Sequence, residues 1–206
     1  EPTRAYLEEI GRRENATLER SEENLGFIIP NNRLAALGQA PYIALLNSDT
    51  EVQPGWDITL TEFLAGRPEY GAVGYEGGLL GADAVGCGRG VGDAIDYVSG
   101  WCVCVSRRTY EAHGLFDEQN LQFAYGEDSD FSLRLQEAGL RIHALSPQLV
   151  THFGNKTIAE VAQTRDTRTS FWANHEYLRH RWADFLAQQR ILARREGNDC
   201  ISPDIR

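Results

Sequence analysis

The chain of 206 residues has no methionine, only four cysteines and no long hydrophobic run. Because a helix needs roughly 20 apolar residues to cross a bilayer, the sequence predicts no transmembrane segment and leaves peripheral association with a membrane open. No signal peptide is recognisable at its start, so we expect a cytoplasmic protein.

The cysteines are too few and too irregularly spaced for a disulfide framework. Cys102 and Cys104 lie two positions apart, so on a strand their side chains would share one face. Their spacing lacks the paired C-x-x-C pattern of a structural zinc site. We therefore expect reduced thiols in a packed core.

Basic residues are scarce as well, with 20 lysines and arginines against 30 aspartates and glutamates and a formal net charge of -10. An acidic surface repels phosphodiester backbones, so nucleic acid is not expected as a partner. A phosphorylated small molecule is not excluded, because a divalent cation can bridge carboxylates and phosphates.

The sequence does contain apolar strand-like runs that alternate with helical segments. Residues 42–46 form a continuous apolar run, typical of a central strand in a parallel sheet covered on both faces, and residues 70–75 and 140–144 give two further strands. Helices are predicted over residues 56–64 and 128–138. This alternation predicts an α/β fold, in which ligands bind beyond the carboxyl ends of strands.

Other segments have weaker patterns. We expect helices over residues 3–13, over 156–196, and up to residue 37 from a cap at Asn31 or Asn32; strands are expected over 17–20 and over 96–106 with a break at Gly100. Residues 77–92 are rich in glycine, which predicts a flexible loop or a loose hairpin. The Lys-Ser/Thr ending of a phosphate-binding P-loop is absent there.

Asp49 is the first candidate site residue, because it follows the apolar run in Asn47-Ser48-Asp49. A carboxylate at a strand end can reach a hard cation, and the Asn47 amide can hydrogen-bond a sugar hydroxyl. The alternative interpretation is that Asp49 or Thr50 only caps the next helix or makes an Asx-turn.

Glu127, Asp128 and Asp130 form a second candidate, an acidic cluster at the start of a predicted helix. The helix dipole favours one or two acids there, but three repel one another and indicate a metal or a proton-transfer role. One of these carboxylates could act as general base toward a hydroxyl.

His152 and the Gly100-Trp101 pair are weaker candidates. A histidine after a strand could ligate the same metal as Asp49, although ordinary loop or core histidines are more common. The indole of Trp101 could stack on a sugar ring, with Gly100 allowing close approach. A core tryptophan beside a strand kink explains the pair as well.

Taken in order, these motifs resemble family 2 glycosyltransferases, with the closest similarity to the bacterial rhamnosyltransferase-like branch. The resemblance runs from about residue 20 to His152, and more weakly from Asn174 to Trp182. The matching motifs are Asn24-x-Gly26-Phe27 with Asn32, Asn47-Ser48-Asp49-Thr50 with Pro54-Gly55-Trp56, Ser99-Gly100-Trp101, Gly126-Glu127-Asp128-Ser129-Asp130-Phe131 with Arg134, and His152.

The resemblance implies a GT-A fold, with a mixed and mostly parallel sheet flanked by helices. It implies a catalytic domain over residues 1–155 and a helical C-terminal extension over 156–206. The implied activity is inverting, metal-dependent transfer of a hexosyl or deoxyhexosyl group from a nucleotide-sugar donor. The implied acceptor is a hydroxyl on a saccharide, a lipid-linked sugar or a protein, and the implied cofactor is Mn²⁺ or Mg²⁺.

The resemblance also implies residue roles on the donor side. Asp49 is expected to bind the metal as part of a DxD-type motif, with Asn47 at the position often held by the first aspartate of that motif. His152 is expected to be the second metal ligand from the protein.

On the acceptor side, Asp128 is expected to be the catalytic base, with Glu127 beside it as a supporting group or a rival base. Gly100 and Trp101 are expected to line the acceptor-side loop. Pro30 departs from the family pattern, which often has glycine there.

Family members open with a strand-helix-strand unit whose acidic residue contacts the nucleotide base, and no such unit precedes Glu1. Together with the absence of methionine, this suggests a fragment of a longer protein. Two other hypotheses stay open: an inactive glycosyltransferase-like binding or scaffold domain, and a metal-dependent hydrolase or nucleotidyltransferase built from the same acids.

Overall fold

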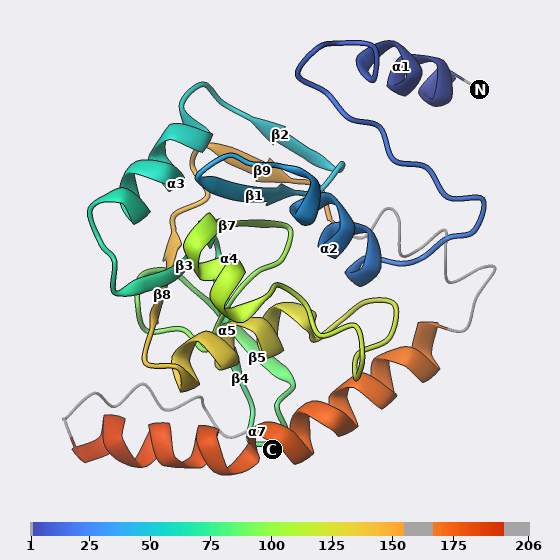
Figure 1. Cartoon of the computed structure of the whole chain (residues 1–206). Helices are drawn as coiled ribbons and strands as arrows, with labels where there is room; N and C mark the ends of the chain where they lie inside the picture. The colour runs from blue at the N-terminus through green and yellow to red at the C-terminus, as the bar shows by residue number, and fades with distance from the viewer. Residues whose placement is uncertain (1, 155–166, 196–206) are drawn as a thin grey trace.

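The computed structural model describes residues 2–154 and 167–195, which form a mixed α/β architecture (Figure 1). Its main sheet has the strand order β1 (Tyr42–Leu46), β7 (Cys102–Ser106), β3 (Tyr70–Tyr75) and β8 (Arg141–Leu145). β7 is antiparallel to both β1 and β3, whereas β3 and β8 run parallel. The predicted mixed sheet is confirmed, although antiparallel pairs outnumber parallel ones among these strands.

The apolar run over residues 42–46 is strand β1, as predicted, but the prediction that it lies at the centre of the sheet is wrong. Among the described strands, β1 lies at the sheet edge, next to β7 alone. Ile43 and Leu45 are buried, whereas Ala44 and Leu46 are exposed. An unbroken apolar run therefore did not reveal which face of the strand is covered.

Helices cover both faces of the sheet. On one face, α3 (Trp56–Ala65) packs Leu60 and Leu64 against a cluster that contains the buried Cys102 and Cys104. On the other face, Leu135 of α5 (Glu127–Glu137) packs with residues of α2 (Ile28–Leu37) and of the sheet. Both thiols are free, as predicted, and burial raises the pKa of each to about 12.

Local capping signals explain where the predicted helix boundaries fail. α2 begins at Ile28, so the Asn31 or Asn32 cap is wrong; the Asn31 side chain instead donates to the Phe27 carbonyl oxygen at 2.7 Å. A helix that we did not predict, α4 (Arg107–His113), begins where the Ser106 hydroxyl accepts a hydrogen bond from the Thr109 N–H. At the N-terminal end, α1 (Pro2–Ile10) is shorter than predicted, and residues 17–20 form no strand.

Two small sheets lie beside the main one. The glycine-rich segment forms a hairpin of β4 (Gly77–Leu80) and β5 (Gly86–Gly90), and β4 also pairs with β6 (Tyr97–Val98). β2 (Thr50–Val52) pairs antiparallel with β9 (Val150–His152), although the sequence predicted neither strand.

The tail helix α7 (Thr167–Arg195) runs along the body beneath the hairpin and α5 (Figure 1). Its buried face carries Leu178, Trp182 and Leu186, which pack with Leu80 and Leu133. The helical prediction is confirmed for this range, while residues 156–166 and 196 lie outside the described residues. The domain boundary at residue 155 stays a prediction.

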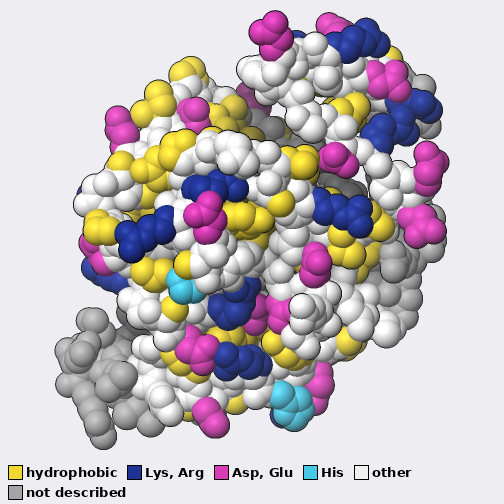
Figure 2. Space-filling view, viewed as in Figure 1, with side chains coloured by type: hydrophobic (Ala, Val, Ile, Leu, Met, Phe, Trp, Pro, Cys, Tyr) yellow, Lys and Arg dark blue, Asp and Glu magenta, His cyan; other side chains and the backbone are white. Residues whose placement is uncertain are grey.

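On one face of the molecule, charged side chains are not gathered by sign (Figure 2). On the face shown in Figure 2, acidic and basic side chains are interspersed, including those on α1, which stands apart from the body. None of the helices within residues 2–154 and 167–195 combines the length and hydrophobicity that a bilayer crossing requires.

Candidate functional site

A pocket of about 880 Å³ opens beside the ends of β1, β3 and β9. It brings together residues that are far apart in the sequence. Every site residue predicted from the sequence lines it: Asn47, Asp49, Gly100, Trp101, Glu127, Asp128 and His152.

The β2–β9 ladder brings Asp49 and His152 together. Thr50 lies opposite His152 in this ladder, and the Phe153 N–H donates to the Asp49 carbonyl oxygen at 2.9 Å. His152 Nε2 then lies 3.2 Å from Asp49 Oδ1. The imidazole also stacks on the Trp101 indole, with ring centroids 4.8 Å apart and planes 13° apart, which fixes the orientation of its nitrogens.

These two side chains fit a divalent cation. His152 Nε2 is buried and, within the described residues, has no hydrogen-bond partner, because its 3.2 Å approach to Asp49 lacks hydrogen-bond geometry. Two neighbouring ligands about 2.1 Å from one octahedral ion would lie about 3 Å apart. The described residues contain no cluster of three or more such ligands, so a cation here would complete its coordination with water or phosphate oxygens.

The two predicted acids, Glu127 and Asp128, lie in the first turn of α5 and line the same pocket as Asp49 and His152. Asp128 Oδ1 accepts from the Ser129 N–H at 2.8 Å, and Asp128 Oδ2 accepts from the Gly100 N–H at 3.1 Å. Glu127 is only 7% exposed, and its Oε2 has no hydrogen-bond partner among the described residues. One acid is therefore fixed in place, and its neighbour is buried with a polar atom unsatisfied.

Burial raises the pKa of both carboxyl groups. For Glu127 the negative charge of Asp128 adds to the effect of burial. For Asp128 the hydrogen bonds from the Gly100 and Ser129 N–H groups partly offset burial. A carboxyl pair in this state can take up a proton at a pH where an exposed carboxylate would not, as a general base requires.

Gly100 and Trp101 have distinct structural roles. A Cβ at Gly100 would lie 3.4 Å from the Asp128 Cβ, at the limit of ordinary van der Waals contact, so the backbone of Gly100 lies close beside Asp128, to which its N–H donates. Trp101 is 9% exposed and stacks on His152. Trp101 is thus both a core residue and a wall of the pocket, and its contact with a sugar stays a prediction.

Asp130, the third acid of the cluster, is fully buried away from the pocket lining. Its Oδ2 accepts from Arg134 Nε at 2.7 Å, and its Oδ1 accepts from the Trp182 indole N–H at 3.0 Å. This acid joins α5 to α7 and leaves the chemistry of the pocket to Glu127 and Asp128.

Sequence reasoning missed Glu76, which lines the pocket next to Arg89 and Tyr97. Glu76 has a φ of 79°, unusual for a residue other than glycine, and pairs with Arg89 at 3.1 Å. Burial, reinforced by the charge of Asp128, raises the pKa of Tyr97 to about 12. The sequence signal that could have indicated Glu76 is the Glu76-Gly77-Gly78 stretch directly after the apolar strand over residues 70–75.

Comparisons with known proteins give one family match and several similar solved structures. Residues 90–184 match the family model described as glycosyltransferase like family 2. A search of curated proteins finds no match. Among solved structures, GalNAc-T7 with UDP, GalNAc and Mn²⁺ aligns with a TM-score of 0.56 at 14% identity, over 66% of this chain and 32% of that one. The mannosyltransferase PcManGT from Pyrobaculum calidifontis, in complex with GDP-Man and Mn²⁺, aligns with a TM-score of 0.48 at 12% identity, over 91% of this chain and 58% of that one.

The similarity to GalNAc-T7 shows that the chain has the GT-A fold, which confirms the predicted fold class. The family match contains the Gly100-Trp101, Glu127-Asp128 and His152 positions but not Asn47 or Asp49. This chain spans only 32% and 58% of the lengths of the two structures.

Proposed function

We propose that the pocket catalyses metal-dependent transfer of a sugar, with inversion, from a nucleotide-sugar donor to an acceptor hydroxyl. One observation carries this proposal: a nitrogen–oxygen ligand pair, the buried Glu127 carboxyl group and the partly buried Asp128 carboxyl group share the wall of a single pocket. The family match over residues 90–184 supports the same class of activity.

On the donor side, Asp49 and His152 would hold Mn²⁺ or Mg²⁺. When bound, the cation would neutralise the charge that develops on the diphosphate leaving group. The GalNAc-T7 structure contains UDP, GalNAc and Mn²⁺, and we extend the donor class and the metal from that protein to this chain. Asn47 would hydrogen-bond a donor hydroxyl through its side-chain amide.

On the acceptor side, Asp128 would accept the proton of the attacking hydroxyl. The acceptor oxygen forms its bond to the anomeric carbon from the face opposite the diphosphate, and the bond to the diphosphate breaks with its electron pair. Attack from the opposite face inverts the anomeric centre. The Gly100 N–H would hold Asp128 in position, and Glu127 would support it from the interior.

The proposal extends to the identity of the transferred sugar and of the acceptor. We propose a hexosyl or deoxyhexosyl group, including rhamnose, drawn from cytoplasmic nucleotide sugars. The acceptor would be a saccharide, a lipid-linked sugar or a protein. If the acceptor is a lipid-linked sugar, peripheral association with the membrane would bring the pocket to it.

A donor screen with Mn²⁺ and Mg²⁺ tests the proposal on the full-length protein. Each nucleotide sugar is added separately, and thermal shift and nucleoside-diphosphate release are measured with and without a panel of acceptors. The proposal predicts metal-dependent stabilisation by one donor class and acceptor-dependent release. Binding without release would favour a scaffold, release without transfer a hydrolase, and no response to any donor would overturn the proposal.

A further inference from the structure

The loop that leads into the pocket acids, residues 121–126, is held by a single buried side chain of the tail helix. Asn174 of α7 is 0% exposed. Its Oδ1 accepts from the Gln122 N–H at 2.8 Å, and its Nδ2 donates back to the Gln122 carbonyl oxygen at 2.8 Å. The same Nδ2 donates to the carbonyl oxygens of Ala124 at 3.1 Å and Tyr125 at 2.8 Å. One carboxamide thus reaches four backbone groups of this loop, with the two N–H bonds of its Nδ2 shared among three carbonyl oxygens.

This loop has a backbone that needs restraint. Phe123 and Tyr125 have φ values of 59° and 77°, which are costly for residues with a Cβ, and Gly126 follows at 85°. A hydrogen bond from the Ala124 N–H to the Gln122 carbonyl oxygen, 2.7 Å long, closes a tight turn around Phe123. Strained conformations of this kind persist where the surrounding contacts define them, and Asn174 supplies those contacts.

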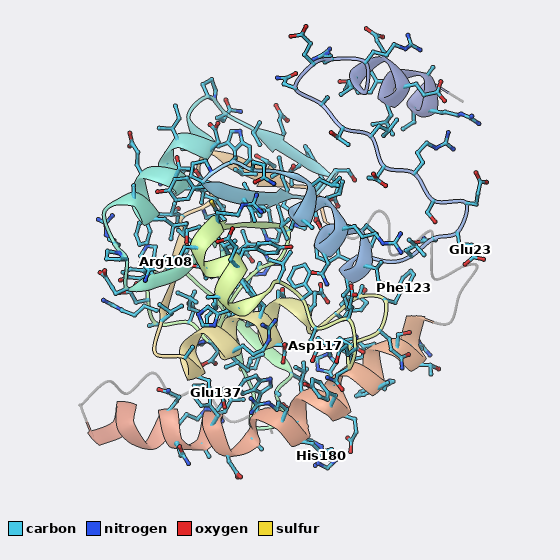
Figure 3. All side chains as sticks on the ribbon, viewed as in Figure 1. Glu23, Arg108, Asp117, Phe123, Glu137 and His180 are labelled. Carbon is cyan, nitrogen blue, oxygen red and sulfur yellow. The ribbon has the colours of Figure 1, made fainter. Side chains whose placement is uncertain are left out.

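The opposite side of the loop is also fixed. The Phe123 carbonyl oxygen accepts from the N–H groups of Phe27 and Ile28, at 2.7 and 3.3 Å, at the start of α2. Phe123 accordingly lies where the start of α2 and the segment leading into α5 meet (Figure 3). The loop is clamped between α2 and α7, immediately before Glu127 and Asp128.

Two further contacts of α7 adjoin the same acids. A Cβ at Gly126 would lie 2.6 Å from Leu178 Cδ1, so the helix packs directly against the residue that precedes Glu127. One turn into α5, the Trp182 indole N–H donates to Asp130. α7 therefore contacts the chain before and after the two pocket acids, whereas neither Asn174 nor Trp182 lines the pocket.

We propose that Asn174 is a positioning residue for the reaction, acting through the loop to hold Asp128 against the Gly100 N–H and toward the acceptor. The inference rests on the proposed function for its activity readout. According to this proposal, the tail helix α7 helps to position the catalytic residues and is not only an appended extension. Displacement of a catalytic group by about 1 Å can lower the rate about 10²-fold, so loss of this restraint should be visible in turnover.

The test compares three variants of α7 in the full-length protein. Asn174→Ala removes the carboxamide. Leu186→Ala truncates a buried side chain on the same helix, remote from the loop, and controls for lost stability. His180→Ala alters an exposed side chain that points away from the body (Figure 3) and controls for the substitution itself.

We expect Asn174→Ala to lower kcat for transfer about 10- to 100-fold, with KM for the donor within about twofold of the wild type. Leu186→Ala should lower the Tm but leave kcat of the folded enzyme unchanged, and His180→Ala should change neither. Equal kcat losses in Asn174→Ala and Leu186→Ala would overturn the proposal. A normal kcat in Asn174→Ala would overturn it as well.

Asn174→Asp keeps the size of the side chain and the acceptor for the Gln122 N–H but removes the amide donors. If Asn174→Ala does not fold, Asn174→Asp carries the test, with the same expected fall in kcat. A normal kcat in this variant would show that the bonds to the three carbonyl groups do not position the site.

Amide hydrogen exchange separates this proposal from the proposed function. Exchange of the Ala124 amide should become about tenfold faster or more in both Asn174 variants, and exchange of the Gln122 amide should do so in Asn174→Ala, which loses its acceptor; neither amide should change in Leu186→Ala. If the wild type transfers no sugar, the proposed function fails, and exchange alone decides whether Asn174 restrains the loop. Unchanged exchange in the Asn174 variants would overturn the restraint whether or not the enzyme is active.

Discussion

Two acid-centred clusters lie at opposite ends of the parallel strands β3 and β8, and they are built in opposite ways. At the starting ends, Asp93 accepts hydrogen bonds from the Tyr70 hydroxyl, at 3.0 and 3.1 Å, and pairs with Arg141. His143 Nδ1 lies 2.6 Å from the same carboxylate, and its ring stacks on Phe63. Every partner that this acid needs is present.

At the other ends of the strands, the pocket acids are incompletely paired. Glu127 Oε2 has no partner among the described residues, and burial raises the pKa of both Glu127 and Asp128. Burial also acts on Asp93, but its hydrogen bonds with His143 and Tyr70 and the charge of Arg141 outweigh it and lower the pKa. The same residue chemistry thus gives a fully hydrogen-bonded cluster at one end and a pair of acids with an unsatisfied oxygen and raised pKa values at the other.

The largest effect should come from removing the proposed base. Asp128→Asn keeps the shape of the side chain but cannot accept a proton, so kcat for transfer should fall about 10²–10⁴-fold while donor binding persists. Asp57→Asn, which alters an exposed acid in the first turn of α3, is the matched control and should be neutral. Normal turnover in Asp128→Asn would move the assignment to Glu127.

A smaller loss is expected from the metal-ligand pair. Asp49→Ala should weaken Mn²⁺-dependent donor binding about 10- to 100-fold, because half of the protein's ligand pair is removed. Titration calorimetry with and without chelator measures this, and Glu51→Ala, an exposed acid on β2, is the control. Unchanged metal dependence in Asp49→Ala would disprove its role as a ligand.

The charged form of Glu127 should lower the stability of the folded protein. Its pKa is raised in the folded state, so its contribution to stability is full below the unfolded pKa and is lost as the pH rises through the folded value. Glu127→Gln should therefore gain stability relative to the wild type between about pH 5 and 8, and the gain should grow by about 1 kcal/mol per pH unit. Denaturant unfolding at several pH values tests this, with the exposed Glu62→Gln as the control. A gain independent of pH would contradict the buried charge.

Asp93 should give the smallest effect, and one confined to stability. Its pKa is lowered in the folded state, so it stabilises above the unfolded pKa and loses this effect as the pH falls below about 4. Its side chain is 42% exposed, and Asp93→Asn should cost about 1 kcal/mol or less at neutral pH, with kcat unchanged. A fall in kcat would show that the two clusters are coupled.

The sequence predicted much of the site because its motifs stand at the ends of strongly patterned elements. Strands β1 and β3 were predicted with correct bounds, and all seven predicted site residues line one pocket. Their chemical roles stay predictions, since geometry alone does not test them.

The features that the sequence did not predict depend on contacts between segments that lie far apart in the sequence. β2 and β9 are three residues long, too short for a period to be visible, and each forms only against the other. The edge position of β1 follows from which strands pair, and that information is not in its composition. Asn174 lies on a helix with a recognisable apolar face, yet its hydrogen bonds with the backbone of residues 122–125 leave no local sequence signal.

The β2–β9 ladder also has a consequence for how the protein is made. It joins segments about half the chain apart, so the entropy of closing a long loop must be overcome before Asp49 and His152 meet. The pair should form late in folding, and a ribosome-bound chain that has not yet exposed β9 would lack a metal site. If Asp49 and His152 hold the proposed cation, its binding would report completed folding, since the two ligands meet only in the folded protein.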